Sequence, residues 1–536
     1  MKLKAGGKAV IILALVSALG FGLYKTDFDK KIVAASTGGK TSSAISAPKL
    51  DSIGTARNPL KVSLVSFHGY APALVANGKN LVTQPDSIYD HHNLNVKFVI
   101  QDDVPTLATI FESGAAHCAW RTSDFWAQEQ PNLRNAGLDG RAVMIVDNTR
   151  GGDAIIARDP SIRSVEDLAD KSVALLQFTP SHGLTIDAID NSSLTSKKKA
   201  SVKYVYINAE EGTGGVRAAF EAGKVDAAVL WDPDLSLAVK NGGGHVVYST
   251  KSASNLIFDV MVCDSRVLKD ADGRQAIEKF VNGWMEGVTV AQRNPDAAVE
   301  ALVNTEELFA LLQKTEGSGF IKSLFTNVVW TDVSENARIL GMVGGTNHYE
   351  RVYQQFDGVY RKAGALANPN SPVIAPQDSF DYSFMRNMVA NAGNSIHENK
   401  ASFTASGLSN AARGTAAVTK PVTVSFNTGS AELTQKSKKI IDTEMVPFIE
   451  NNGSAYIEIS GNTDSIGSRD ANMSLSRARA KVVTDYLVSE WEMSRSRFSV
   501  VGNGPDHPIC RENADGTPID ECRALNRSTR VSVLGK

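Results

Sequence analysis

Between residues 59 and 250 the sequence alternates short apolar runs with longer segments of helical character. Strands that alternate with helices predict a mostly parallel sheet, in which the helices connect neighbouring strands. Helical periodicity then dominates from about residue 273 to residue 364. Because residues 59–390 are too many for one such sheet, we expect two α/β lobes. The predicted strands are Lys61–Phe67, Asn95–Ile100, Ala142–Val146, Ser172–Leu176, Val202–Ile207, Ala227–Leu230 and His245–Tyr248.

One uncharged apolar segment, Ala9–Tyr24, lies near the N-terminus and follows Lys2, Lys4 and Lys8. With its neighbours it approaches the ~20 residues that a helix needs to cross a bilayer. Basic residues before such a segment hold that end in the cytoplasm, so we expect an uncleaved signal anchor. A cleaved signal peptide is the alternative, because a charged start and a short apolar stretch fit both. Either form exports the chain, and the anchor predicts a single-pass protein of the bacterial inner membrane with its bulk in the periplasm.

Two segments without periodicity divide the rest of the chain. Residues 26–58 are rich in Ser, Thr, Ala, Gly and Lys, and residues 391–420 are small and polar, so both are predicted to be flexible linkers. The predicted order is a transmembrane helix (residues 1–25), a linker, an α/β domain (residues 59–390), a second linker and a smaller α+β domain (residues 421–536).

Composition and motifs exclude several classes of function. The net charge of −2 over 536 residues lacks the positive surface that nucleic-acid binding needs. Four cysteines are too few for a disulfide scaffold or a zinc-finger array. The sequence holds no H-E-x-x-H, G-x-S-x-G or C-x-x-C motif. We therefore expect no enzymatic activity, no cofactor and no metal.

Several short segments of residues 60–300 resemble, in order, bacterial periplasmic substrate-binding proteins of the nitrate, sulfonate, taurine and thiamine-precursor type. They are FHGYAP from Phe67, SG at Ser113 with AWRTSD from Ala119, GGDAI from Gly151, SVEDL from Ser164, and VDAA from Val225 leading to WDP at Trp231. The resemblance implies a two-lobed domain that captures a small molecule in the cleft between its lobes. It also implies an ABC-transporter-type receptor or sensor, with a membrane permease as partner.

Candidate ligand contacts follow the carboxyl ends of the predicted strands, where ligands bind in α/β sheets. Aromatic walls around a few polar groups suit a small molecule. The helix start expected near residue 180 favours an anionic group, whereas the acidic candidates favour a cationic one, so the charge of the ligand stays open. The candidates are His68, Tyr70, Trp120, Ser123, Asp124, Asp153, Thr179, Ser181, His182, Trp231 and Asp232.

Several of these candidates have a structural alternative. Both tryptophans could be core aromatics, and His68 could be a turn residue. Asp153 and Asp232 could cap helices or pair with arginine, and Ser181 could be a helix N-cap.

Residues 421–536 resemble the OmpA-like peptidoglycan-binding domain. Thr463-Asp464, Gly467 and the segment from Asn472 to Leu487 reproduce the family signature T-D-x-x-G … N-x-x-L-S-x-x-R-A-x-x-V-x-x-Y-L. The resemblance implies that Asp464 and Arg479 grip the diaminopimelate residue of the peptide stem. An acid can accept from its ammonium group, while a guanidinium can bind its carboxylate in bidentate fashion.

Further residues of this domain are candidate peptidoglycan contacts. Asn472 lies seven residues before Arg479, which places both on one face of a helix. The family ends in N-R-R-V, whereas this chain has two extra residues, so either arginine after Asn526 could take the second position. The additional candidates are Thr463, Asn472, Asn526, Arg527 and Arg530.

The cysteines divide into two expectations. Some members of the OmpA-like family carry a disulfide where Cys510 and Cys522 lie, so the resemblance implies that these two residues pair. In an exported chain such a short loop is worth about 3 kcal/mol in the chain-entropy model. Cys118 and Cys263 are expected to be buried and unpaired.

These observations predict an envelope-anchored solute-binding protein that also binds peptidoglycan without a covalent bond. The alternative is a structural tether between the inner membrane and the cell wall, in which the middle domain docks a protein partner.

Overall fold

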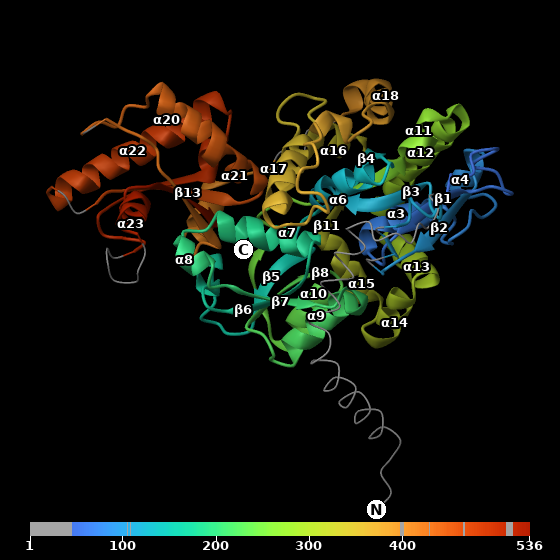
Figure 1. Cartoon of the computed structure of the whole chain (residues 1–536), viewed down its shortest axis with the longest axis horizontal. Helices are drawn as coiled ribbons and strands as arrows, with labels where there is room; N and C mark the ends of the chain where they lie inside the picture. The colour runs from blue at the N-terminus through green and yellow to red at the C-terminus, as the bar shows by residue number, and fades with distance from the viewer. Residues whose placement is uncertain are drawn as a thin grey trace, which may run out of the picture.

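Figure 1 shows the computed structural model of the chain, which describes residues 46–103, 106–107, 109–396, 401–427, 429–464, 467–510 and 518–535. The predicted transmembrane helix and most of the first linker lie outside these residues. Within the described ranges, no helix is both long enough and apolar enough to span a membrane.

The first lobe is built on a six-stranded sheet with the order β11-β4-β10-β3-β1-β2. Helix α3 (Ala71–Ala76) packs against α12 (Ala271–Arg293), and α6 (Ser123–Asn135) packs against α17 (His348–Lys362). Strands β3 and β10 are buried along their whole length, as expected for central strands covered on both faces. The strands are β1 (Leu60–Leu64), β2 (Val96–Ile100), β3 (Cys118–Thr122), β4 (Gly140–Thr149), β10 (Phe258–Asp264) and β11 (Val328–Trp330).

The second lobe has a five-stranded sheet with the order β7-β6-β8-β5-β9. Its helices α7 (Pro180–Asp190), α9 (Gly212–Glu221) and α10 (Asp234–Gly242) lie around this sheet, with α7 above it and α9 and α10 at its lower side in Figure 1. Phe220 of α9 is buried in a small core with alternate residues of the central strands. The strands are β5 (Asp153–Ala157), β6 (Ser172–Leu176), β7 (Lys203–Ile207), β8 (Ala227–Trp231) and β9 (His245–Ser249).

Two segments connect the lobes, residues 150–152 between β4 and β5 and residues 250–257 between β9 and β10. The predicted pair of α/β lobes is therefore confirmed. The predicted mostly parallel arrangement holds for four of the six described strands of the first sheet and four of the five of the second. The exceptions are β10 and β11 in the first lobe and β5 in the second, which run antiparallel to their neighbours. A strand that follows a connection from the other lobe begins at the cleft. It therefore runs antiparallel to the strands whose carboxyl ends lie at the cleft.

The C-terminal domain is a four-stranded sheet with the order β12-β15-β13-β14, covered by α22 (Arg469–Glu490). Glycines allow the close approach of this helix to the sheet. A Cβ atom at Gly461 would lie 2.0 Å from the carbonyl oxygen of Ser476 in α22, and one at Gly502 would lie 2.6 Å from the backbone nitrogen of Arg477. The strands are β12 (Val418–Val422), β13 (Tyr456–Asn462), β14 (Phe498–Gly504) and β15 (Thr529–Leu534).

The second half of the predicted linker is structured and belongs to this domain. Helix α19 (Ala405–Ala411) follows Phe403, whose ring packs 5.2 Å from that of Tyr456. Strand β12 begins at Val418 and pairs with β15 at the sheet edge. An edge strand is held by backbone hydrogen bonds, which do not require alternating apolar side chains. A sequence of small and polar residues can therefore form such a strand without showing a hydrophobic period.

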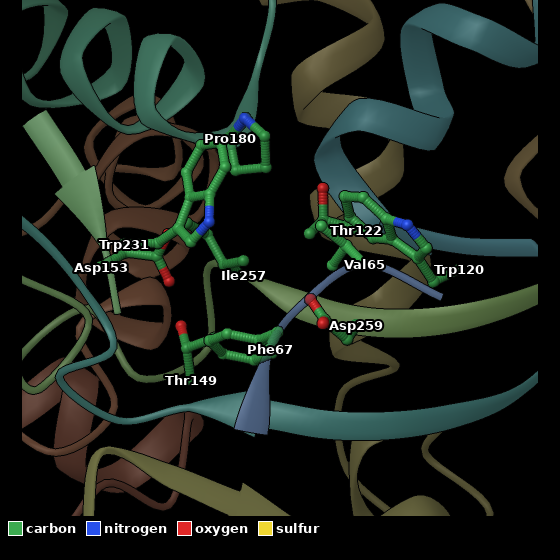
Figure 2. A pocket seen from close by; sticks show the side chains of 10 residues that line it. All are labelled: Val65, Phe67, Trp120, Thr122, Thr149, Asp153, Pro180, Trp231, Ile257 and Asp259. Carbon is green, nitrogen blue, oxygen red and sulfur yellow. The ribbon is translucent and has the colours of Figure 1, made fainter. Parts of the chain in front are cut away.

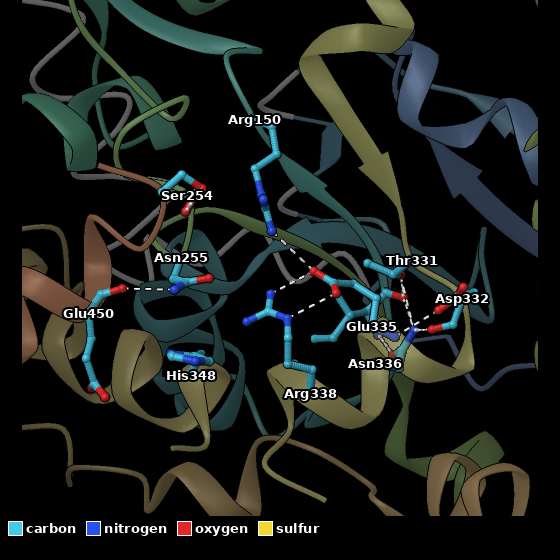
Figure 3. Close-up of polar contacts among 12 residues, drawn as sticks. Arg150, Ser254, Asn255, Thr331, Asp332, Glu335, Asn336, Arg338, His348 and Glu450 are labelled. Atoms are coloured by element: carbon cyan, nitrogen blue, oxygen red, sulfur yellow. Dashed lines mark hydrogen bonds and ion pairs between the residues drawn. The ribbon is translucent and has the colours of Figure 1, made fainter. Parts of the chain in front are cut away.

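The C-terminal domain packs against the second lobe and the 250–257 segment. The backbone N–H of Asn255 donates to the carbonyl of Asn451 at 3.0 Å, and its side chain donates to the carbonyl of Glu450 at 2.9 Å. Figure 3 shows Asn255 facing Glu450, whose carboxylate pairs with Arg351 of α17. The C-terminal domain is thus bound to one of the two connections between the lobes.

Both cysteine pairs form disulfides. Cys510 and Cys522 are joined, as the resemblance implied, with their Cα atoms 5.7 Å apart. The expectation that Cys118 and Cys263 are unpaired is wrong: they are bonded, and their Cα atoms are 4.0 Å apart. The two residues lie opposite each other in the antiparallel pairing of β3 with β10, which is a contact between distant parts of the chain.

Replacing both members of the first pair, as Cys118→Ala with Cys263→Ala, should lower the free energy of unfolding by about 2–4 kcal/mol. The reason is that the bond closes a loop of 145 residues and so restricts the unfolded chain. Urea denaturation without reductant, followed by tryptophan fluorescence, measures the change. The matched control is Cys510→Ala with Cys522→Ala, which removes a disulfide between residues only 12 apart in the sequence. Its free energy of unfolding should fall by less, and a larger loss in the control would contradict the argument.

Candidate functional site

A cavity lies between the two lobes, with an empty volume of about 360 Å³ that includes its open mouth. Strands β1, β3 and β4 end at this level and β10 begins there, while the second lobe contributes the start of β5, the start of α7 and the end of β8. Figure 2 shows side chains from both lobes pointing toward the space between them. The lining residues are Val65, Phe67, Trp120, Thr122, Thr149, Asp153, Pro180, Trp231, Ile257 and Asp259.

Three of the predicted ligand contacts, Trp120, Asp153 and Trp231, line this cavity. Tyr70 lies behind its wall and donates a 2.5 Å hydrogen bond from its hydroxyl to the carboxylate of Asp259. Tyr70 therefore holds a lining residue in place rather than facing the cavity itself.

The predicted contacts of the first lobe that do not line the cavity are buried. His68 is fully buried beside Phe67, with ring centroids 4.4 Å apart, and burial lowers the pKa of its imidazole to about 3. Its carbonyl accepts from the indole of Trp330 at 3.1 Å. Ser123 accepts from the backbone N–H of Phe258 at 3.4 Å through its hydroxyl.

The remaining contacts predicted in the second lobe lie around the starts of α7 and α10. Thr179 and Ser181 are buried, and the Thr179 hydroxyl donates to the carbonyl of Leu176 at 2.7 Å. His182 packs against two tyrosine rings of β7, and burial lowers the pKa of its imidazole to about 4. Asp232 accepts from the backbone N–H of Ser236 at 3.0 Å, which agrees with its alternative role at a helix start.

Asp232 also bridges the lobes, because the side-chain amide of Asn327 donates to its other carboxylate oxygen at 2.7 Å. Tyr360 of α17 forms a second bridge. Its hydroxyl contacts the carboxylate of Asp124 in the first lobe at 3.2 Å and the carbonyl of Thr179 in the second lobe at 2.9 Å. These contacts hold the two lobes together beside the cavity.

Buried carboxyl groups dominate the electrostatics of the cavity. Burial raises the pKa of Asp259 to about 7 and raises the pKa values of Asp147 and Asp153 well above their usual range. The hydrogen bond from Tyr70 opposes the shift of Asp259, while the negative charge of Asp124 adds to it. Asp147 and Asp153 are also raised by the charge of Asp259. The buried acids therefore disfavour one another's ionisation.

Sequence reasoning missed Asp147 and Asp259. Each lies in an apolar strand sequence, VMIVD in β4 and FDVMV in β10, at the end that faces the other lobe. An acidic residue next to such a run was the available signal. Asp259 lies in β10, which is outside the predicted strands, whereas Asp147 directly follows the predicted strand Ala142–Val146 and carried the signal in the sequence itself.

In the C-terminal domain, Asp464 follows β13 and lies beside Arg527, with 3.5 Å between carboxylate and guanidinium. The side-chain amide of Asn472 donates to the carbonyl of Asp464 at 3.4 Å. Arg479 extends from α22 over the ring of Phe426, at 4.8 Å, and its Nε donates to the carbonyl of Ser430 at 3.0 Å. The structure therefore places an arginine beside Asp464, but that arginine is Arg527.

The other predicted contacts of this domain are largely buried. Thr463 donates its backbone N–H to the carbonyl of Gly504 at 2.9 Å. Asn526 accepts from the backbone N–H of Ile509 at 2.7 Å and donates to the carbonyl of Cys510 at 3.0 Å, so it organises the disulfide loop. Arg530 is buried in β15, where burial lowers the pKa of its guanidinium to about 10.

Metal binding has no support in the described ranges, which contain no cluster of three or more His, Cys, Asp or Glu side chains able to hold a metal ion.

Comparison with known proteins identifies relatives of both regions. Residues 425–517 match the OmpA family model. The peptidoglycan-binding protein ArfA of Mycobacterium bovis is 39% identical over 79 residues, which are 15% of this chain and 22% of that protein. A protein of Escherichia coli named for the binding of aliphatic sulfonates is 32% identical over 93 residues, which are 17% of this chain and 27% of that protein.

Among solved structures, the periplasmic aliphatic sulphonate binding protein SsuA from Escherichia coli matches with a TM-score of 0.46 and 16% identity, over 61% of this chain and 99% of that one. The chain spans about a quarter of the length of the two curated relatives. The sequence matches confirm the OmpA-like C-terminal domain and the resemblance of the middle region to sulfonate-binding proteins.

Replacing Asp259 with Asn should make the ligand-free protein more stable above neutral pH. The pKa of Asp259 is raised from its ordinary value of 3.8 to about 7 in the folded protein, so the fold favours the protonated acid. The stability that this gives is fully present below pH 3.8 and is lost as the pH rises through about 7. Thermal unfolding over this pH range should show a smaller fall of Tm for Asp259→Asn than for the wild type. Asp272→Asn, at an exposed acid of α12, serves as control, and an equal fall in wild type and Asp259→Asn would refute the assignment.

Proposed function

We propose that this protein is a solute-binding protein of the bacterial envelope that captures a small molecule between its two lobes and binds peptidoglycan through its C-terminal domain. The observation that carries the proposal is the cavity between the lobes, with walls from both lobes, aromatic side chains and buried polar groups. Such a combination is typical of small-molecule sites. Anchoring in the inner membrane through residues 1–25, with a permease as partner, is part of the proposal.

The connections between the lobes support capture by closure. Residues 150–152 and 250–257 are the two connections, and domains joined in this way can close around a ligand by rotation at such segments. The contacts of Asn327 with Asp232 and of Tyr360 with Thr179 would form on closure. They lie beside the cavity and would keep solvent from a bound solute.

Peptidoglycan binding is supported by the OmpA family match and by the charged groups around Asp464. The side chains of Asp464 and Arg527 remain 27% and 53% exposed, so a ligand can reach both. The carboxylate would bind the ammonium group of a diaminopimelate residue, and Arg479 or Arg527 would bind its carboxylate. A relative named for peptidoglycan binding is 39% identical to this chain over 79 residues.

Native mass spectrometry of the full chain, extracted in mild detergent without refolding, tests solute capture. We expect a discrete mass increment that disappears on denaturation, because a cavity closed by both lobes should retain its ligand. No increment, together with no thermal shift in amines, sulfonates or thiamine-like heterocycles, would contradict solute capture. It would favour the alternative of a wall tether with a protein-docking middle domain.

Replacing Asp464 with Ala, or replacing Arg479 and Arg527 together with Ala, should weaken binding to purified sacculi by about tenfold or more, because one charge of the stem peptide then loses a charge-assisted hydrogen bond. Co-sedimentation with the sacculi measures the effect. Lys481→Ala is the matched control, since Lys481 lies on the same helix and pairs with Asp485. Binding that is unchanged in both clamp variants would rule out the proposed clamp.

A further inference from the structure

Acidic groups face the interlobe cavity from both sides. Asp153 comes from the second lobe and Asp259 from the first, and no Lys or Arg is among the described residues that line the space. Two arginines of the first lobe are nearby in the sequence, but each is paired with an acid. Arg121 is buried against Glu129, and Arg150 contacts Glu335 at 3.3 Å, as Figure 3 shows for the second pair.

Asp147 is a third acid on the same part of the sheet. In the antiparallel pairing of β4 with β10, Asp147 lies opposite Asp259, and Asp259 in turn lies opposite Thr122 of β3. Asp147 is fully buried, and neither of its carboxylate oxygens has a hydrogen-bond partner within the described structure. Like charges directly opposite each other weaken a sheet. This arrangement therefore lowers stability unless a positive charge compensates it.

The positive ends of the nearby helices are already occupied by the chain itself. Asp124 lies in the first turn of α6. The carboxylate of Asp124 also lies close to α7, because a Cβ atom built on Gly183 in the first turn of that helix would be 2.9 Å from it. Because the start of a helix attracts negative charge, Asp124 takes the place that an anionic ligand would otherwise fill at the start of α6, and it places a second acid beside the first turn of α7. In addition, Pro180 at the start of α7 has no N–H to offer.

Aromatic walls complete the site. The rings of Phe67, Trp120 and Trp231 line the cavity, and the faces of such rings attract cations, in particular organic ammonium groups. The indole N–H of Trp120 is buried without a partner in the described structure, so it can donate to a hydroxyl or carbonyl oxygen of a ligand.

We infer that the interlobe cavity binds a small organic cation, a protonated amine or quaternary ammonium compound that also carries a hydrogen-bond acceptor such as a hydroxyl group. The cation would lie between the aromatic rings and neutralise the facing carboxylates of Asp153 and Asp259, with Asp147 behind them. This inference rests on the proposed solute-binding function and specifies the class of its ligand. It differs from the anionic ligands that the names of the sulfonate-binding relatives indicate for those proteins.

Isothermal titration calorimetry on the full chain at neutral pH tests this inference with probes of matched size. The cationic probes are choline and ethanolamine, the neutral probe is 3,3-dimethylbutan-1-ol, which has the shape of choline without its charge, and the anionic probe is 2-hydroxyethanesulfonate. We expect a cationic probe to bind about tenfold or more tightly than the neutral probe, because only the cation gains the charge interaction. The anion should not bind.

Two Asp→Asn variants make the test specific. Asp259→Asn should weaken binding of the cation by about tenfold or more, since it removes one facing charge. Asp187→Asn should leave binding unchanged, because Asp187 is an equally buried acid that lies outside the cavity and accepts from Gln355 at 2.5 Å. As Asp259→Asn is expected to be the more stable protein when empty, a loss of binding in it is not a loss of folding.

The outcomes separate this inference from the proposed function. Binding of the anion or of the neutral probe at least as tightly as the cations would overturn the cationic ligand and leave solute capture standing. If no probe binds although native mass spectrometry shows a bound solute, the cationic ligand is likewise overturned and solute capture still stands. Absence of both a bound solute and any probe binding would overturn the inference and the proposed solute capture together.

Discussion

Two acidic groups, Asp147 and Asp259, which would carry the same charge when ionised, lie opposite each other on neighbouring strands of the first lobe, buried and at the boundary with the second lobe. Removing such groups from water raises their pKa values and costs stability. The surrounding structure reduces only part of this cost. Tyr70 donates to Asp259, whereas Asp147 has no partner in the described structure. Acidic groups with strongly raised pKa values beside a cavity are typical of functional sites. The burial of these two acids is the basis for both the candidate site and the proposed class of ligand.

The position of the C-terminal domain is tied to the same region. The 250–257 segment ends directly before β10, the strand that carries Asp259. Asn255 of this segment is held by the backbone of Glu450 and Asn451, and the Glu450 carboxylate is held by Arg351 of α17. A rotation of the lobes about this segment must therefore carry the C-terminal domain along or break these contacts. The proposed wall-binding domain and the proposed solute site are mechanically connected through these hydrogen bonds.

Within the C-terminal domain, small residues set the geometry around Asp464. Gly461 and Gly502 let α22 lie directly on the β13–β14 pair, because a side chain at either position would meet the helix backbone. This packing places Asn472, at the start of α22, where its amide binds the backbone of Asp464. Arg479 lies two turns further along and is turned toward the 427–430 loop.

Local sequence patterns determined strands β1, β2 and β4 of the first lobe, strands β6, β7, β8 and β9 of the second, the helix that carries Asn472, and Trp120 and Trp231 as residues at strand ends near the cavity. These features depend on hydrophobic period and on strand ends, which a single stretch of chain carries by itself. Tertiary structure alone decided the antiparallel entry of β5 and β10, the bond between Cys118 and Cys263, the pairing of Asp147 with Asp259 and the choice of Arg527 beside Asp464. Each of these joins residues that are far apart in the chain. A local pattern contains no information on which distant strand lies alongside, so only the packing of the whole domain brings such groups into contact.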